Sequence, residues 1–290
     1  MTFYRSALLS LCLMSALSSP VWAASPTPSV ASSNYDFTVQ YDVYAGGMHL
    51  IDVTQQFTLS DTSYSSTMTA KPTGFFSKIV PWEGQYTTKG LVNKDGKLIP
   101  QRHAKTSRWG DERDETIMSF DAGGQLIRMT DREWVYGKTR PAPQNVTPDK
   151  SLSRNALDLV TTVLRMLQHA QTTSMSTKAA CNNSDIVFDG KRRFSMNFTG
   201  IGIETLPATN YSPFKGKAPR CEIEVKPLAG FNGKKRGFYK IQEDSRAQGE
   251  LPSLWLLPAW ANGGPPIPVR MRIKSEYGAI MVHATKVVRK

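Results

Sequence analysis

The side chains that could carry out acid–base or metal chemistry are dispersed along this sequence rather than grouped in a known motif. There is no H-E-x-x-H pair for zinc and no G-x-S-x-G turn for a nucleophilic serine. The four histidines lie far apart in the sequence: His49, His103, His169 and His283. We therefore predict no catalytic residue, no metal ligand and no cofactor.

The densest acidic segment is 111–115, in which Asp114 and Glu115 could act as paired carboxylates for general acid/base catalysis. Arg113 lies within the same segment, and the segment separates two expected strands. This pattern is typical of a solvated turn. An enzyme acting on cell-wall polymers is therefore the last of three functional interpretations.

A basic turn is the clearest candidate for binding an anion. Lys191, Arg192 and Arg193 directly follow the turn sequence Asp189-Gly190. The planar guanidinium of arginine can hold a phosphate or carboxylate through two hydrogen bonds. Neighbouring residues of a strand point to opposite faces, so at most one of the two arginines points inward. We predict an anion-binding site at these three residues, with a charged hairpin tip as the alternative.

A group of aromatic residues is the candidate for apolar contacts. Phe75, Phe76 and Trp82 lie in a segment that has neither strand nor helix periodicity and contains Pro72 and Pro81. Aromatic side chains on an irregular connection can edge an apolar groove or contact a membrane surface. We therefore predict a candidate apolar groove at Phe75, Phe76 and Trp82, with core packing as the alternative.

The N-terminal 23 residues have the pattern of a cleaved secretory signal peptide. Arg5 precedes an apolar run over 7–16, and small side chains at Val21 and Ala23 favour cleavage after Ala23. The apolar run is shorter than the roughly 20 residues that a membrane span needs. We expect a periplasmic location, no transmembrane anchor after cleavage, and a disordered lead-in over 24–34.

Two cysteines, Cys181 and Cys221, remain after this cleavage, because Cys12 lies in the signal peptide. In an oxidising compartment two such residues indicate a disulfide. They lack the C-x-x-C spacing that is typical of a redox pair, which is the alternative. We therefore predict a Cys181–Cys221 disulfide.

Positive charge is concentrated in the C-terminal half of the chain. Of the net charge of +12, residues 151–290 contribute +11, from 21 basic and 10 acidic residues, while residues 24–150 contain 14 of each. Such a surface attracts lipid phosphates, lipopolysaccharide or other anionic partners. Export separates the protein from nucleic acid, so we predict no nucleic-acid partner. A basic surface that only improves solubility is the alternative.

Period-two alternation of apolar and polar residues predicts a strand meander over 35–150, with turn sequences such as Asn93-Lys94-Asp95-Gly96 between strands. One segment, 153–169, has apolar residues at helical spacing, with Ser153 as the expected N-cap. Strands are expected again in the disulfide-containing half over 170–290, including one over 237–242.

These elements predict a mainly β fold in a single domain over 35–290. We expect a strongly curved antiparallel sheet, an open barrel or β-spiral, with one main amphipathic helix packed on or in it. Two β-sandwiches divided near residue 151 are the alternative.

Several sequence blocks carry a resemblance to a known family. They include Leu157-Asp158, Cys181, the hairpin Phe188-Asp189-Gly190-Lys191-Arg192-Arg193-Phe194, Cys221, Trp255-Leu256-Leu257-Pro258 and Tyr277-Gly278. In this order the chain resembles an uncharacterised Gram-negative periplasmic family catalogued as a domain of unknown function (number thirty-one zero eight). The resemblance implies an envelope protein with a disulfide, and it implies no catalytic residue.

Three functional hypotheses follow. The first is a non-enzymatic periplasmic protein that binds or assembles an apolar, amphiphilic or anionic envelope component. The second is a structural or interaction protein with a filled core that acts through its surface. The third is the enzyme acting on cell-wall polymers.

Overall fold

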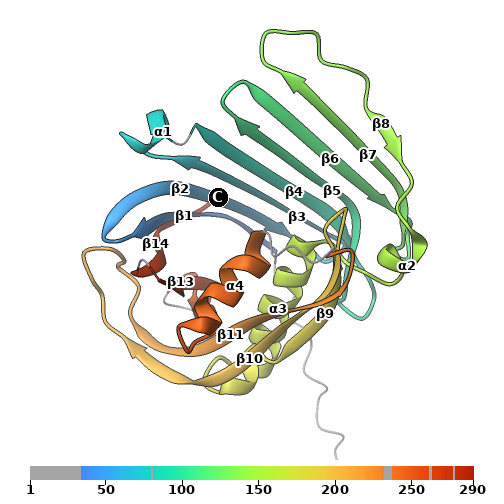
Figure 1. Ribbon diagram of the computed structural model, residues 1–290. Helices are drawn as coiled ribbons and strands as arrows, with labels where there is room; N and C mark the ends of the chain where they lie inside the picture. The colour runs from blue at the N-terminus through green and yellow to red at the C-terminus, as the bar shows by residue number, and fades with distance from the viewer. Residues whose placement is uncertain (1–33, 80, 232–236, 261–262, 277) are drawn as a thin grey trace, which may run out of the picture. The chain divides into compact units, whose positions relative to one another are not determined.

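One antiparallel sheet of fourteen strands dominates the part of the chain that the structure describes (Figure 1). The computed structural model describes residues 34–79, 81–231, 237–260, 263–276 and 278–290. The strands are β1 (Tyr35–Ala45), β2 (Met48–Leu59), β3 (Ser63–Pro72), β4 (Trp82–Val92), β5 (Leu98–Trp109), β6 (Glu112–Phe120), β7 (Leu126–Val135), β8 (Gln144–Val146), β9 (Asn183–Phe188), β10 (Arg193–Leu206), β11 (Gly216–Ala229), β12 (Ser253–Pro258), β13 (Pro266–Ser275) and β14 (Gly278–Arg289). The helices are α1 (Phe76–Ile79), α2 (Lys150–Ser153), α3 (Leu159–Thr173), the 3-10 helix η1 (Lys178–Cys181) and α4 (Gly237–Ala247).

The order of strands across the sheet follows the order along the chain, except that β1 pairs with β14. This pairing joins two meanders, β1–β8 and β9–β14, side by side. The edge strands β8 and β9 do not pair with each other, so the sheet is open. The predicted mainly β fold with one open antiparallel sheet is therefore confirmed. The alternative of two sandwiches is wrong, because all fourteen strands belong to one sheet.

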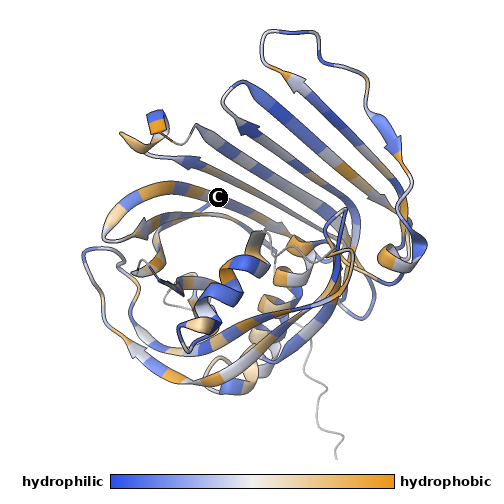
Figure 2. Cartoon of the chain, viewed as in Figure 1, coloured by the Kyte–Doolittle hydropathy of each residue, from blue (hydrophilic) through white to orange (hydrophobic). Residues whose placement is uncertain are grey.

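The strands form where the sequence alternates, as Figure 2 shows by the change of hydropathy along them. In β1, Phe37, Val39 and Tyr41 are buried on one face, while Gln40 between them is exposed. Gly46 and Gly47, with φ of 57° and 80°, make the tight turn to β2. Both positive values are those that a two-residue hairpin turn requires, and glycine adopts them without strain.

The largest apolar core lies between α3 and the strands β9–β12. From α3 it receives Met166, Leu167 and Ala170, which recur at the spacing of one helix face. The predicted disulfide, Cys181–Cys221, is present in this core with both residues fully buried. It ties η1 to β11 directly beneath α3.

The predicted start of the helix over 153–169 is wrong. Residues 150–153 form the short helix α2, and Asn155, at φ 50°, breaks the chain from the helical path. The helix proper, α3, begins at Leu159, and its N-cap is Asp158, whose side chain accepts from the Thr161 N–H. With α4 there are two substantial helices among the described residues, where the sequence predicted one.

The strand expected over 237–242 is wrong, because these residues belong to helix α4. The strand β12 pairs with β11 only from Arg220 to Glu222, so the backbone of Val225 has no strand partner on that side. The buried side chain of Gln242 replaces it: its amide oxygen accepts from the Val225 N–H, and its amide nitrogen donates to the Val225 carbonyl at 3.0 Å. One side-chain amide thus satisfies the backbone groups that a strand would have paired.

Candidate functional site

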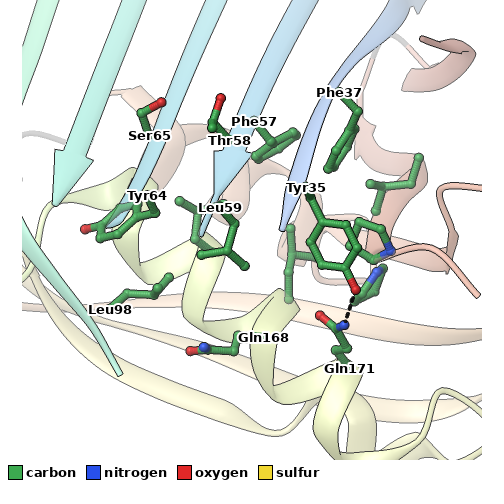
Figure 3. Close-up of a pocket in the computed structure, with 15 residues that line it drawn as sticks. Tyr35, Phe37, Phe57, Thr58, Leu59, Tyr64, Ser65, Leu98, Gln168 and Gln171 are labelled. Atoms are coloured by element: carbon green, nitrogen blue, oxygen red, sulfur yellow. Dashed lines mark hydrogen bonds between the residues drawn. The ribbon is translucent and has the colours of Figure 1, made fainter. Parts of the chain in front are cut away.

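An apolar groove runs between helix α3 and one end of the β1–β3 hairpins (Figure 3). It encloses about 540 Å³ when the space open to solvent at its mouth is included. The sheet contributes aromatic and aliphatic side chains from the first residues of β1, the last of β2 and the first of β3 and β5. The principal ones are Tyr35, Phe37, Phe57, Leu59, Tyr64 and Leu98.

Helix α3 forms the opposite wall of the groove. Leu164, Leu167, Gln168 and Gln171 recur at intervals of three and four residues, so they share the helix face that meets the sheet. The start of β13, Pro266–Ile267, contributes a further part of the lining. The groove therefore depends on the docking of α3 against strands that are far from it in the sequence.

The polar groups at the groove are uncharged. Gln171 donates from its amide to the Tyr35 hydroxyl at 2.8 Å, as Figure 3 shows, and Gln168 donates to the Gly96 carbonyl at 2.6 Å. Among the described residues, no Asp, Glu, Lys, Arg or His lines the groove. The arrangement suits an apolar chain with hydrogen-bonding groups at its exposed end.

A buried polar network holds the N-terminus of α3 against the sheet. The carboxylate of Asp158, which is completely buried, accepts from the Thr88 hydroxyl at 3.0 Å and lies 3.2 Å from Nδ1 of His103. It also accepts from the Thr161 hydroxyl, so the Tyr64 hydroxyl, 2.7 Å from Thr161 Oγ1, is the donor in that contact. The network thus reaches the groove through Tyr64.

The same network sets the ionisation of its acidic member. Burial by itself would raise the pKa of Asp158, but the hydrogen bond and charge of His103 and the two hydrogen bonds from Thr161 outweigh it and lower the pKa. The single hydroxyl hydrogen of Thr88 goes to Asp158, so His103 Nδ1 carries a hydrogen, which faces both Thr88 Oγ1 at 2.6 Å and the Asp158 carboxylate at 3.2 Å. Asp158 is therefore ionised at neutral pH, and both of its carboxylate oxygens accept hydrogen bonds.

A second polar group, on β1 and β2, was not recognised from the sequence. The β1–β2 register places Asp42 directly opposite Asp52, and His49 Nε2 lies 3.7 Å and 3.1 Å from their oxygens. The three donor atoms lie within 4.8 Å of one another, a set that could hold a divalent cation. A protonated His49 would balance the two carboxylates equally well. The turn Gly46-Gly47 was the sequence pattern that could have revealed this group, because it sets the register.

The predicted basic turn lies at the β9–β10 hairpin. Arg192 is held by Asp189, with Nε 2.8 Å from its carboxylate, and its guanidinium also lies over the Phe231 ring. Arg193 donates to the carbonyls of Leu152 and Arg154 at 2.9 Å and 2.6 Å. Both arginines thus have partners within the protein, and Lys191 is exposed.

Anion binding at this turn stays a prediction. It requires the anion to compete with the groups that already contact each arginine. An anion can reach Arg192 by sharing its guanidinium with Asp189, whereas at Arg193 it would displace two backbone carbonyls. If the turn binds an anion, Arg192→Lys is expected to weaken binding to lipopolysaccharide several-fold, because the planar fork is lost, and Arg193→Lys is not. Binding at low and physiological salt checks this. Equal binding of all three proteins would show a charged hairpin tip only.

The aromatic residues that were predicted to form an apolar groove do not lie beside α3. Phe75 and Phe76 lie at helix α1, in the β3–β4 connection, and Trp82 begins β4. None of the three lines the groove beside α3. Phe75 is 68% exposed, so the core-packing alternative is wrong for this residue.

The two acids of the enzyme hypothesis do not share a site. Asp114 and Glu115 are consecutive residues of β6 and therefore point to opposite faces of the sheet. Asp114 accepts a hydrogen bond from Ser107, while Glu115 is buried between Arg132 and Arg140. Each carboxylate is occupied by its own structural partner.

Comparison with known proteins agrees with the resemblance seen in the sequence. The chain matches the family described as "Protein of unknown function (DUF3108)" over residues 40–285, and it belongs to that family. No curated protein matches it. It is similar to the crystal structure of a beta-barrel-like protein of domain of unknown function DUF1849 from Brucella abortus. That likeness has a TM-score of 0.44 at 10% identity and covers 90% of this chain and 100% of the other.

No helix within the described ranges is both long enough and apolar enough to cross a bilayer.

Proposed function

We propose that this protein is a non-enzymatic periplasmic binding protein that holds the apolar chain of an envelope amphiphile in the groove beside α3. The single observation that carries the proposal is the apolar lining of that groove, supplied by α3 and the ends of β1–β3 and β5. Concave sites with mainly apolar walls and a few polar groups are typical of small-molecule sites.

The energetics favour an alkyl chain as the occupant. Each methylene group removed from water contributes about 0.8 kcal/mol, before the cost of ordering the ligand is subtracted. Because the groove is open at its mouth, the polar end of the ligand can stay in water. The Gln171 amide and the Tyr35 hydroxyl lie there to bond an ester or hydroxyl group.

The proposal includes export with cleavage after Ala23, which the signal-peptide pattern supports. Native mass spectrometry of protein purified from periplasm tests location and binding together. We expect a chain that begins at Ala24 and carries a co-purified lipid. A chain beginning at Met1, or one with no ligand that also displaces no apolar dye, would favour the surface-acting structural protein instead.

A substitution at the groove mouth tests the site itself. Gln171 is exposed and lines the groove, whereas its neighbour Thr172 is exposed and does not. We expect Gln171→Trp to weaken binding of an apolar dye or fatty alcohol at least tenfold by obstructing the mouth. The matched variant Thr172→Trp is expected to bind like the wild type. Equal effects of the two substitutions would place the ligand elsewhere.

A further inference from the structure

The connections β1–β2, β3–β4, β5–β6 and β7–β8 lie at one end of the first meander (Figure 1). Exposed large apolar side chains gather at this end. In an antiparallel meander alternate connections lie at the same end, so these four hairpin tips form a row. They carry six large hydrophobic residues that are between 42% and 70% exposed: Met48, Phe75, Ile79, Trp109, Val135 and Tyr136. The predicted aromatic segment, which the groove does not use, is part of this row.

The opposite end of the same meander has a different character. Its connections contain two exposed large hydrophobic residues, Leu91 and Ile127. The tip segments 45–49, 71–82, 108–113 and 134–144 contain six basic and two acidic residues, a net charge of +4. The connections at the opposite end, 59–64, 91–98 and 120–127, contain two basic and three acidic residues, a net charge of −1. Arg108 and Arg140 are paired with Glu83 and Glu115, which lie outside these segments, so Lys71, Lys78 and Lys138 supply the exposed positive charge. Apolar residues and these lysines are thus concentrated together at one end.

The spacing of the tips indicates what they contact. Adjacent tips are two strands apart, about 9.5 Å, so the four tips extend over roughly 30 Å. Isolated side chains at this spacing do not form the continuous patch of about 800 Å² that a protein partner needs. A fluid lipid interface can accept each of them separately. Trp and Tyr are also the residue types that favour the boundary between lipid and water.

We propose that this end of the sheet docks on the surface of an anionic lipid bilayer. Phe75, Trp109 and Tyr136 enter the interface, and the basic residues of the same tips, such as Lys78 and Lys138, meet the anionic head groups. The groove beside α3 is lined by residues at the opposite end of these strands, so docking does not use its lining. The inference therefore stands independently of the proposed function.

Vesicle binding tests the proposal. The full chain is mixed with vesicles of phosphatidylcholine alone or with one quarter phosphatidylglycerol, and bound protein is measured by flotation at low and physiological salt. We expect at least tenfold tighter binding to the anionic vesicles, with the difference reduced by salt. The combined variant Phe75→Ser, Trp109→Ser, Tyr136→Ser is expected to lose at least tenfold in affinity for them.

The matched control is Ile127→Ser, which removes a side chain that is 67% exposed at the opposite end of the meander. We expect this variant to bind within twofold of the wild type. All variants carry the same N-terminal segment, so its contribution cancels in the comparison, and circular dichroism confirms that each is folded. Failure of the wild type to bind anionic vesicles, or an equal loss in Ile127→Ser and the combined variant, would overturn the proposal.

Discussion

Replacing Asp158 by Ala is expected to lower the free energy of unfolding by about 3–5 kcal/mol, because several buried polar groups lose their acceptor at a cost of about 1–3 kcal/mol each. Asp158 is fully buried and caps α3 while it also bonds Thr88 and pairs with His103. Its loss leaves the His103 imidazole, the Thr88 hydroxyl and the first N–H groups of α3 without their acceptor. Because α3 forms one wall of the groove, ligand binding is expected to fall together with stability.

The pH dependence follows from the lowered pKa of Asp158. A carboxyl whose pKa is lower in the folded state than in the unfolded chain stabilises the fold above the unfolded value, about 3.9. This contribution is lost as pH falls through the folded pKa. We therefore expect the stability difference between the wild type and Asp158→Ala to be full at neutral pH and to shrink below about pH 4.

Urea unfolding of both proteins from pH 3 to pH 7 measures this difference. Asp149→Ala is the matched control, because Asp149 also caps a helix, α2, but is exposed. Its replacement is expected to cost much less, since water can replace the lost acceptor. Similar losses from the two substitutions would show that capping, rather than the buried network, is what Asp158 contributes.

Removal of the Cys181–Cys221 disulfide is expected to lower the free energy of unfolding by about 4 kcal/mol in the chain-entropy model for a loop of this length. The two residues are 40 positions apart, and the loop between them contains β9, β10 and the first residues of β11. Both cysteines are fully buried, so the variant with both replaced by Ala avoids placing a polar hydroxyl in the core.

The effect is expected to extend to the position of η1. A Cβ at Gly200, which pairs with Cys221 in the β10–β11 ladder, would lie 1.7 Å from the Lys178 carbonyl oxygen. The disulfide therefore holds η1 in close contact with the strands. Equilibrium unfolding with and without reductant measures the loss. Two free thiols in peptide maps of the native, exported protein would contradict the bond itself.

Much of the fold was predictable because it depends on local patterns. Period-two alternation identified β1–β7, since a strand with one buried face must alternate. Turn sequences such as Asn93-Lys94-Asp95-Gly96 are local as well: the Asn93 side chain accepts from the N–H groups of Asp95 and Lys97. The expectation of export, together with the two cysteines outside the signal-peptide pattern, was enough to predict the disulfide that the core contains.

Elements that depend on distant partners were misread. Residues 237–242 resemble a strand in the sequence, yet they form a helix because Gln242 can satisfy Val225 from a helical position. Ser153 was a reasonable N-cap by residue type. Asp158 caps the helix instead, because only its carboxylate meets Thr88 and His103 on strands about 55–70 residues away.

The sequence by itself determined a mainly β chain with one disulfide, because alternation and turn sequences act over a few residues. It also placed Phe75 outside the regular strands. In the structure this side chain is exposed in the β3–β4 connection. The groove was decided only by the tertiary structure. Its walls come from β1–β3, β5, α3 and β13, and none of these segments has a lining pattern that differs from ordinary core residues. Whether an apolar side chain faces a filled core or an open groove depends on what packs opposite it, and here that is the position of α3.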